Sequence, residues 1–310
     1  MSARSGLLGA LSIDEEAEAW IGAHVAPVGR MELVHERPWG TVWRVPVAGR
    51  GAWFKLCAPV QAFEPRLTAA LAHRRPDRLP DVLGHDDERA WLLLGDAGEP
   101  LGFSGGIQPW LSVLPLYAEL QRAEAAHVAE HLHGGVPDRR LEAFPALYET
   151  MLARELPLGN ADLAHLRAFA PRFADLCREL AAAGIPETIQ HDDLHGANVY
   201  PGVGAPRILD WGDACISHPF LTAFVTFLHL EETCGPAGDD PWCARLRDSY
   251  LEPWVRSIEL RAAFELAQRL GPFAHAFKEL RVFDAVPVDE RPRHAPDLAK
   301  LLAGCVAAAS

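Results

Sequence analysis

Positive charge is scarce in this sequence. The 310 residues include 29 Lys and Arg against 42 Asp and Glu, which gives a formal net charge of -13 at pH 7. A nucleic-acid-binding surface needs clustered Lys and Arg to neutralise phosphates, so this balance argues against a nucleic-acid partner. An acidic surface could attract a cationic substrate, but acidity that serves solubility alone is common among soluble proteins.

Cysteine pairs and long apolar segments are also missing. The six cysteines are scattered and form no C-x-x-C pair, which argues against a disulfide framework or a zinc ribbon. The longest apolar run, Phe220–Leu230, contains two Thr and a His and is too short to span a bilayer. Met1–Leu11 makes a poor signal peptide. We therefore expect a cytoplasmic protein without a membrane partner. No pattern in the sequence specifies an oligomeric state.

Short segments rich in β-branched and aromatic residues dominate the first 94 residues. Pro or Gly separates them, which predicts a mostly antiparallel sheet with an inserted helix. The expected strands are Arg30–His35, Thr41–Val47, Ala52–Leu56, Val82–His85 and Ala90–Leu94. The expected helices are Ile13–His24, capped by Ser12, and Gln61–Arg74.

The pattern changes after a segment rich in glycine. Residues 95–106 contain five glycines and a proline and are predicted to form a hinge or linker. Helical patterns follow at Gln108–Leu132, Arg140–Arg154, Asp162–Ala183, Pro219–Glu232, Trp242–Tyr250, Arg261–Arg269 and Pro296–Ala308. The stretch Ile189–Ser217 fits no regular period. This order predicts an α+β, protein-kinase-like fold, with a nucleotide-binding lobe (1–94), a linker (95–106) and a helical catalytic and substrate lobe (107–310).

The irregular stretch contains two motifs of phosphoryl-transfer enzymes. His191–Asn198 reads H-D-D-L-H-G-A-N and matches the kinase catalytic-loop pattern H-x-D-L-x-x-x-N. Asp210 follows an apolar segment and precedes Trp-Gly, as the Asp of D-F-G does. Phosphoryl transfer needs one carboxylate at the acceptor hydroxyl, a role that suits Asp193. It also needs oxygen ligands for Mg²⁺, which Asn198 and Asp210 would supply. Asp193, with His191, is the predicted catalytic pair; the alternative is a polar loop that only satisfies turn backbone.

A single lysine interrupts the apolar segment Trp53–Leu56. A buried lysine is costly without an anionic partner, so Lys55 is predicted to contact nucleotide phosphates and a carboxylate. Glu64 is the only acidic residue in the helical stretch that follows, although Pro65 disfavours helical geometry at Glu64. The alternative is that Lys55 points to solvent at a strand edge.

These residues together resemble the aminoglycoside phosphotransferase/choline kinase family. The resemblance spans roughly Val34 to Leu228 and is sharpest at His191–Asn198 and Asp210–Asp213. It implies transfer from ATP, or GTP, with Mg²⁺ to a hydroxyl of an aminoglycoside, amino-alcohol or sugar. By the same resemblance Lys55 contacts the α- and β-phosphates, and Gly40 is the one glycine in the nucleotide-covering loop. The backbone expected to receive the adenine belongs to Leu93, Leu94 and Gly95.

A small-molecule acceptor is favoured over a peptide. Only a few residues separate Gly212 from Pro219, no A-P-E follows, and Asp192 replaces the Arg that pairs with a phosphorylated loop. Trp242 and Trp254 could stack on the acceptor or belong to the core. The acidic residues that could line its pocket, or form a solvated face, are Glu231, Glu232, Asp239, Asp240, Asp248 and Glu252.

Two alternatives compete with an active kinase. His127–His131 reads H-V-A-E-H, the H-x-x-E-H pattern of a zinc metalloprotease, with Glu130 as the general base. A nucleotide-binding but catalytically silent kinase homologue, acting as a sensor or scaffold, would carry the same fold.

Overall fold

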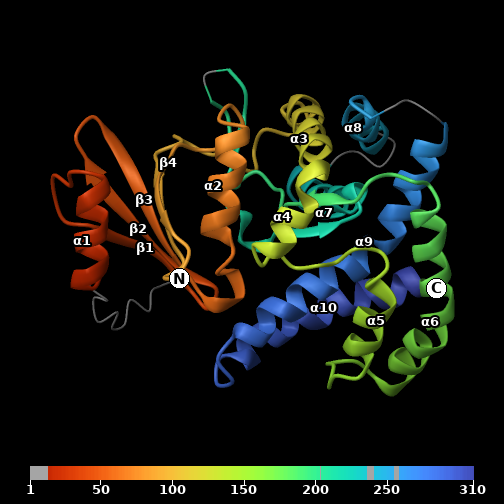
Figure 1. The fold of residues 1–310 in the computed structure, drawn as a ribbon. Coiled ribbons are helices and arrows are strands. Elements are labelled where there is room, and N and C mark those ends of the chain that lie inside the picture. The colour runs from red at the N-terminus through yellow and green to blue at the C-terminus, as the bar shows by residue number, and fades with distance from the viewer. Residues whose placement is uncertain (1–12, 203, 236–240, 255–257) are drawn as a thin grey trace.

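The computed structural model describes residues 13–202, 204–235, 241–254 and 258–310. A five-stranded antiparallel sheet and a larger helical part lie beside each other (Figure 1). The strand order is β1-β2-β3-β5-β4. The strands are β1 (Glu32–Arg37), β2 (Gly40–Val47), β3 (Arg50–Cys57), β4 (Val82–Asp86) and β5 (Trp91–Gly95). Each predicted strand is therefore present, with its ends within two residues of those predicted.

Helix α1 (Glu15–His24) covers one face of the sheet. Phe54 on β3 is fully buried, and its ring lies 6.0 Å from that of Trp20 on α1 and 5.8 Å from that of Trp91 on β5. The helix begins later than predicted. Asp14 is its N-cap, because its carboxylate accepts a hydrogen bond from the Ala17 amide at 2.7 Å. The predicted cap, Ser12, lies outside the described residues.

Helix α2 (Glu64–Arg74) lies between the sheet and the helical part (Figure 1). Its first residue is Glu64, so the expectation that Pro65 disfavours helical geometry there was wrong. Pro65 occupies the first turn, where an amide has no intrahelical acceptor, and its missing N–H costs nothing. Glu64 therefore begins the helix and reaches Lys55 on β3, the middle strand of the sheet.

The helical part contains α3 to α10. Its helices are α3 (Trp110–Glu124), α4 (Val128–His133), α5 (Phe144–Leu152), α6 (Asn160–Ala181), α7 (Thr222–Cys234), α8 (Trp242–Leu251), α9 (Ile258–Ala285) and α10 (Arg291–Ala309). An aromatic cluster holds α5, α6 and α9 together: Phe173 stacks on Tyr148 at 4.4 Å and meets Phe273 at 5.0 Å. None of the described helices is long and apolar enough to cross a membrane.

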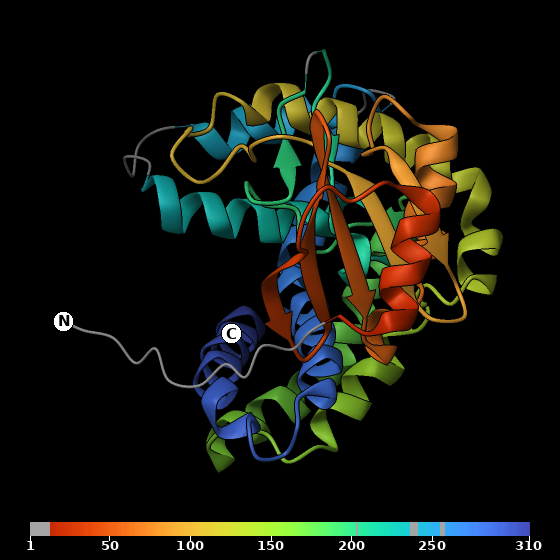
Figure 2. The same ribbon diagram turned by 90° about the vertical axis from the view of Figure 1, so that its left-hand side faces the viewer.

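Two helix predictions were wrong in ways that matter for the site. The expected helix Gln108–Leu132 is divided by a 3₁₀ turn at Ala125–His127. The expected helix Arg261–Arg269 is only part of α9, which continues through Gly271 and Pro272 to Ala285. Helix α10 lies alongside α9 (Figure 2) and likewise begins before its predicted start, with Pro296 inside it.

The irregular stretch folds into two short ribbons. β6 (Thr188–Gln190) pairs with β9 (Cys215–Ser217), and β7 (Val199–Tyr200) pairs with β8 (Arg207–Ile208). The loop between β6 and β7 carries the first motif, and the turn after β8 carries the second. Both motifs are therefore anchored by short antiparallel strand pairs beside the five-stranded sheet.

Candidate active site

Asp193 is the residue around which the first motif is organised. Asn198 donates its amide N–H to the Asp193 carbonyl at 2.9 Å, and its Nδ2 is 3.4 Å from the carboxylate. His195 Nε2 lies 3.2 Å from the same carboxylate oxygen. The Ala197 amide donates to His195 Nδ1, so the neutral imidazole carries its proton on Nε2, facing Asp193. The carboxylate is therefore held in one orientation while remaining partly open.

His191 does not reach the cleft, which corrects its place among the predicted catalytic residues. Its side chain is fully buried, and Nε2 bonds the Leu209 carbonyl at 2.7 Å. Its ring packs on Trp211, with centroids 4.8 Å apart. Burial lowers the pKa of His191, so the imidazole is neutral and donates from Nε2. His191 therefore connects the first motif to the second through Leu209 and Trp211, and it positions the motifs without contacting the cleft.

The loop is also packed against the predicted linker. Leu101 donates to Val199 O at 2.7 Å and Gly102 to Gly196 O at 2.9 Å. A Cβ at Gly196 would lie 1.9 Å from Gly102 O, far inside any allowed contact. Only glycine fits at this position of the motif, because two backbones meet there.

Asp192 is buried behind the catalytic loop and pairs with Arg139 at 2.5 Å. Asp192 and Asp210 both adopt positive φ, 61° and 63°. Non-glycine residues in this region are uncommon and strained, and they cluster at functional sites. The backbone of the first motif therefore bends at Asp192, directly before Asp193, and that of the second motif bends at Asp210 itself. Arg139, which pairs with Asp192, is a partner that sequence reasoning missed.

Lys55 joins the sheet to the second motif. Its Nζ lies 2.6 Å from Glu64 Oε2 and 2.6 Å from Asp210 Oδ1, and its side chain is 14% exposed. Burial acts to lower the pKa of Lys55, but the carboxylates of Asp210 and Glu64 outweigh it and raise the pKa well above its usual value. Three residues that were predicted to share a nucleotide site are thus in direct contact, and Lys55 does not point away from the protein at a strand edge.

The oxygen atoms that a divalent cation needs are available beside Lys55. The side chain of Asp210 is 55% exposed, and the Leu209 amide donates to Asn198 O at 2.9 Å, which fixes the two motifs together. The amide nitrogen of Asn198 is engaged by Asp193, which leaves its side-chain oxygen as the candidate cation ligand. A carboxylate and an amide oxygen are ligands suited to Mg²⁺.

Lys278 is the main site residue that sequence reasoning missed. It projects from α9, its side chain is 4% exposed, and its Nζ lies 3.4 Å from Asp193 Oδ1, 3.7 Å from Asp213 and 2.6 Å from Glu279. Burial acts to lower the pKa of Lys278, but Asp193 and Asp213 raise it well above its usual value. A lysine inside the apolar pattern Phe-Ala-His-Ala-Phe-Lys is the same signal that identified Lys55.

Gly40 lies directly over Lys55. It ends the β1–β2 turn, and a Cβ there would meet Leu56 O at 3.1 Å and Lys55 Cε at 3.4 Å. This close approach to β3 leaves little room for a side chain, which explains why the turn has a glycine at this position. It also places the β1–β2 turn directly beside the Lys55 side chain.

The predicted adenine residues need correction. Leu93 and Leu94 pair with β3 on one side and β4 on the other, and the Gly95 amide donates to Asp81 O at 2.8 Å. Their backbone groups are therefore used within the sheet. The segment that begins at Ala97 is the nearest one outside the sheet pairing.

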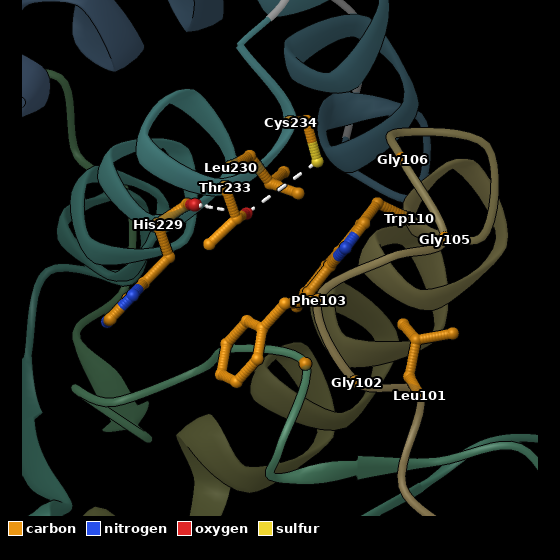
Figure 3. Close-up of a pocket in the computed structure, with 11 residues that line it drawn as sticks. Leu101, Gly102, Phe103, Gly105, Gly106, Trp110, His229, Leu230, Thr233 and Cys234 are labelled. Carbon is orange, nitrogen blue, oxygen red and sulfur yellow. Dashed lines mark hydrogen bonds between the residues drawn. The ribbon is translucent and has the colours of Figure 1, made fainter. Parts of the chain in front are cut away.

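Two hollows lie near Asp193. Figure 3 shows the smaller one, with Phe103 and Trp110 on the linker side and His229, Thr233 and Cys234 on α7. Its volume of about 10 Å³ holds no more than a water molecule. The larger cavity, about 730 Å³, is bordered by α7, α9, α10, Asp193 and Asp210, which makes it the candidate acceptor pocket.

Most of the acidic and aromatic residues proposed for an acceptor pocket lie elsewhere. Trp242 and Trp254 are buried in the core, 5.6 Å from Phe227 and 5.4 Å from Phe220 between ring centroids. Asp248 pairs with Arg261 at 3.0 Å, and of the acidic set within the described residues only Glu232 lines the larger cavity. Asp239 and Asp240 lie outside the described residues.

The H-x-x-E-H segment does not form a metal site. It crosses the junction between the 3₁₀ turn and α4, and His131 Nε2 is bonded to Glu124 at 2.9 Å in a buried cluster with Arg74. Among the described residues, the converging His, Cys, Asp and Glu groups are Asp193, His195 and His229, whose ligand atoms lie within 4.8 Å of one another. Because the Ala197 amide donates to His195 Nδ1, Nε2 carries the proton and points an N–H at Asp193. In this tautomer Nε2 has no lone pair with which to bind a metal ion.

No family model matches the chain, and no curated protein matches it in sequence. Solved structures do match its fold. Choline kinase LicA from Streptococcus pneumoniae is 12% identical, with 93% of this chain and 99% of that one covered and a TM-score of 0.63. The GDP complex of an aminoglycoside 2'-phosphotransferase IIIa mutant is 18% identical, with 95% and 99% covered and a TM-score of 0.62.

Amicoumacin kinase hAmiN, in a complex with AMP-PNP and Ca²⁺, is 10% identical, with 94% of each chain covered and a TM-score of 0.63. These likenesses confirm the predicted α+β, protein-kinase-like fold. At such identities they establish the fold and not the reaction.

Proposed function

We propose that the protein transfers the terminal phosphoryl group of ATP or GTP to a hydroxyl group of a small molecule. The observation that carries the proposal is the placement of Asp193 and Asp210 on one cavity, with Asp210 in contact with the Lys55–Glu64 pair. A kinase site needs this combination, because the donor phosphates and the acceptor hydroxyl must meet between a cation and a carboxylate. The solved structures of similar fold are small-molecule kinases, which supports the same reading.

Asp193 is the proposed catalytic base. Burial acts to raise its pKa, but Lys278 and His195 hold the pKa well below its usual value, so the carboxylate is ionised at neutral pH. It would orient the acceptor hydroxyl and take its proton. The acceptor oxygen then bonds to the γ-phosphorus as the bond from that phosphorus to the β,γ-bridging oxygen breaks, and the nucleoside diphosphate leaves.

The remaining site residues are assigned to binding the nucleotide, which donates the phosphoryl group. Lys55, oriented by Glu64, would contact the α- and β-phosphates, with Gly40 in the covering turn above it. Asp210 and Asn198 would hold Mg²⁺, which neutralises phosphate charge when it is bound. A region beginning near Ala97 would receive the base.

A thermal-shift titration with Mg-ATP and Mg-GTP tests the proposal. We expect the wild type to be stabilised by one or both and Asp210→Ala to lose the effect. Asp289→Ala is the matched control, because Asp289 is an exposed carboxylate outside the cavity. No shift in the wild type, or an equal shift in Asp210→Ala, would contradict the proposal. Nucleotide binding without transfer to any acceptor would favour the catalytically silent alternative.

A further inference from the structure

We propose that the acceptor of this site has a bulky apolar body, a reacting hydroxyl and no more than one positive charge. The inference rests on the proposed function, because it concerns the acceptor side of the same cleft. The cavity of about 730 Å³ that extends from Asp193 has the size of a pocket for a drug-sized molecule. The cavity also reaches Asp210, so the donor phosphates would share it, and the part bordered by α7, α9 and α10 is left to the acceptor.

Three helices give the cavity an apolar wall. Phe224 and Leu228 come from α7, Val282 and Phe283 from α9, and Leu298 and Leu301 from α10. Such a wall stabilises an apolar ligand by roughly 25 cal/mol for each Å² that it removes from water. It gives no hydrogen bonds to the many hydroxyl and amino groups of a polycationic sugar, and a polar group buried without a partner is unfavourable.

The cavity's carboxylates are mostly neutralised by the protein itself. Glu232 pairs with Lys300 at 3.0 Å, and Glu279 pairs with Lys278 at 2.6 Å. Asp213 accepts from Gln61 at 3.2 Å and faces Lys278. Asp297 on α10 is the exception: its carboxylate has no ion pair or hydrogen bond within the described part of the chain. Apart from Asp193 and Asp210, the described part of the cavity therefore offers one unpaired carboxylate, that of Asp297. A ligand with one positive charge can pair with it, whereas further positive charges would have no free carboxylate.

His275 borders the cavity as an uncharged side chain. It lines the cavity, and its Nδ1 is buried without a hydrogen-bond partner among the described residues. Burial lowers the pKa of His275 to about 3, so the imidazole is neutral. His275 therefore adds no charge to the wall of the cavity.

Gly304 determines how much room the acceptor has. It lies inside α10, where glycine is less favourable than alanine, and it borders the cavity. A Cβ at Gly304 would meet no atom within 4 Å, so no packing within the protein requires a glycine there. A larger side chain would instead project into the space that the ligand needs.

Acceptor binding measured without nucleotide tests the inference. The probes are erythromycin and clindamycin, which carry an apolar body and one amine, kanamycin, which carries several amines, and choline. Thermal shift and calorimetry would compare the wild type with Gly304→Leu. The control is Gly22→Leu, since Gly22 is an exposed helical glycine on α1 with equally open surroundings, far from the cavity in sequence.

We expect at least one of the two amphiphiles to bind the wild type and Gly22→Leu alike, and to bind Gly304→Leu at least ~10-fold more weakly. Preferential binding of kanamycin or choline, no binding of either amphiphile, or unchanged binding in Gly304→Leu would overturn the inference. The response to Mg-ATP, measured separately, decides the proposed function. Loss of that response with amphiphile binding intact would contradict the function and leave the acceptor class standing.

Discussion

Replacing Lys278 with methionine removes the cation that lies behind Asp193. Its Nζ is within 3.7 Å of the carboxylates of Asp193, Asp213 and Glu279, and its side chain is only 4% exposed. Two unit charges 4 Å apart attract by about 4 kcal/mol at an effective dielectric constant of 20. Removal takes from these three carboxylates a counter-charge that is itself buried, and the net cost of breaking such a pair is about 3–5 kcal/mol.

Urea unfolding at neutral pH measures this cost. We expect Lys278→Met to lose about 3–5 kcal/mol of unfolding free energy and Lys278→Arg to lose less, since arginine keeps the charge. The matched control is Lys300→Met. Lys300 pairs with Glu232 at 3.0 Å but is 80% exposed, so its loss should cost no more than about 1 kcal/mol. If Lys278→Met is no less stable than Lys300→Met, the reasoning about the buried cation is refuted.

Three further predictions follow from the site and the core. Asp193→Asn should lower phosphoryl transfer to an identified acceptor by at least ~100-fold in a coupled assay, while the Mg-ATP thermal shift persists; undiminished turnover would remove its role as base. Gly196→Ala should lose about 1–3 kcal/mol in urea unfolding, because its Cβ would meet Gly102 O at 1.9 Å and break two backbone hydrogen bonds; wild-type stability would rule out this close approach. Burial lowers the pKa of His218 to about 3, below its unfolded value of about 6.5, so its contribution is complete above pH ~6.5 and falls by up to about 1.4 kcal/mol per pH unit as the pH drops toward 3. Urea midpoints between pH 7 and 4 should therefore fall less steeply in His218→Gln, and an equal slope would contradict the assignment.

Local patterns were sufficient for the strands and for both motifs. Strands are recognisable because β-branched and aromatic side chains must pack on a sheet, and β3 buries Ala52 and Phe54 on one face, as such a pattern predicts. The catalytic loop is recognisable because phosphoryl transfer restricts the residue types at fixed spacings. Lys55 was identified because a lysine in an apolar strand needs a partner.

Helix α9 shows where local patterns failed. Gly271–Pro272 is typical of a helix end, and the helix was predicted to stop at Arg269. In the structure Gly271 serves packing, because a Cβ there would lie 2.4 Å from the ring of Phe224 on α7. Packing of α9 against its neighbours overrides the local preference, and the continuation carries His275 and Lys278 to the site.

The sequence by itself therefore determined the fold class, the strands and the residues suited to phosphoryl chemistry, because these depend on neighbours along the chain. Only the tertiary structure brought Lys278 to Asp193 across 85 positions and Arg139 to Asp192 across 53. It alone decided which carboxylates of the cavity are neutralised, and that Asp297 has no partner within the residues that the structure describes. Charge pairing and cavity shape depend on distances between helices, and no spacing along the sequence encodes those distances.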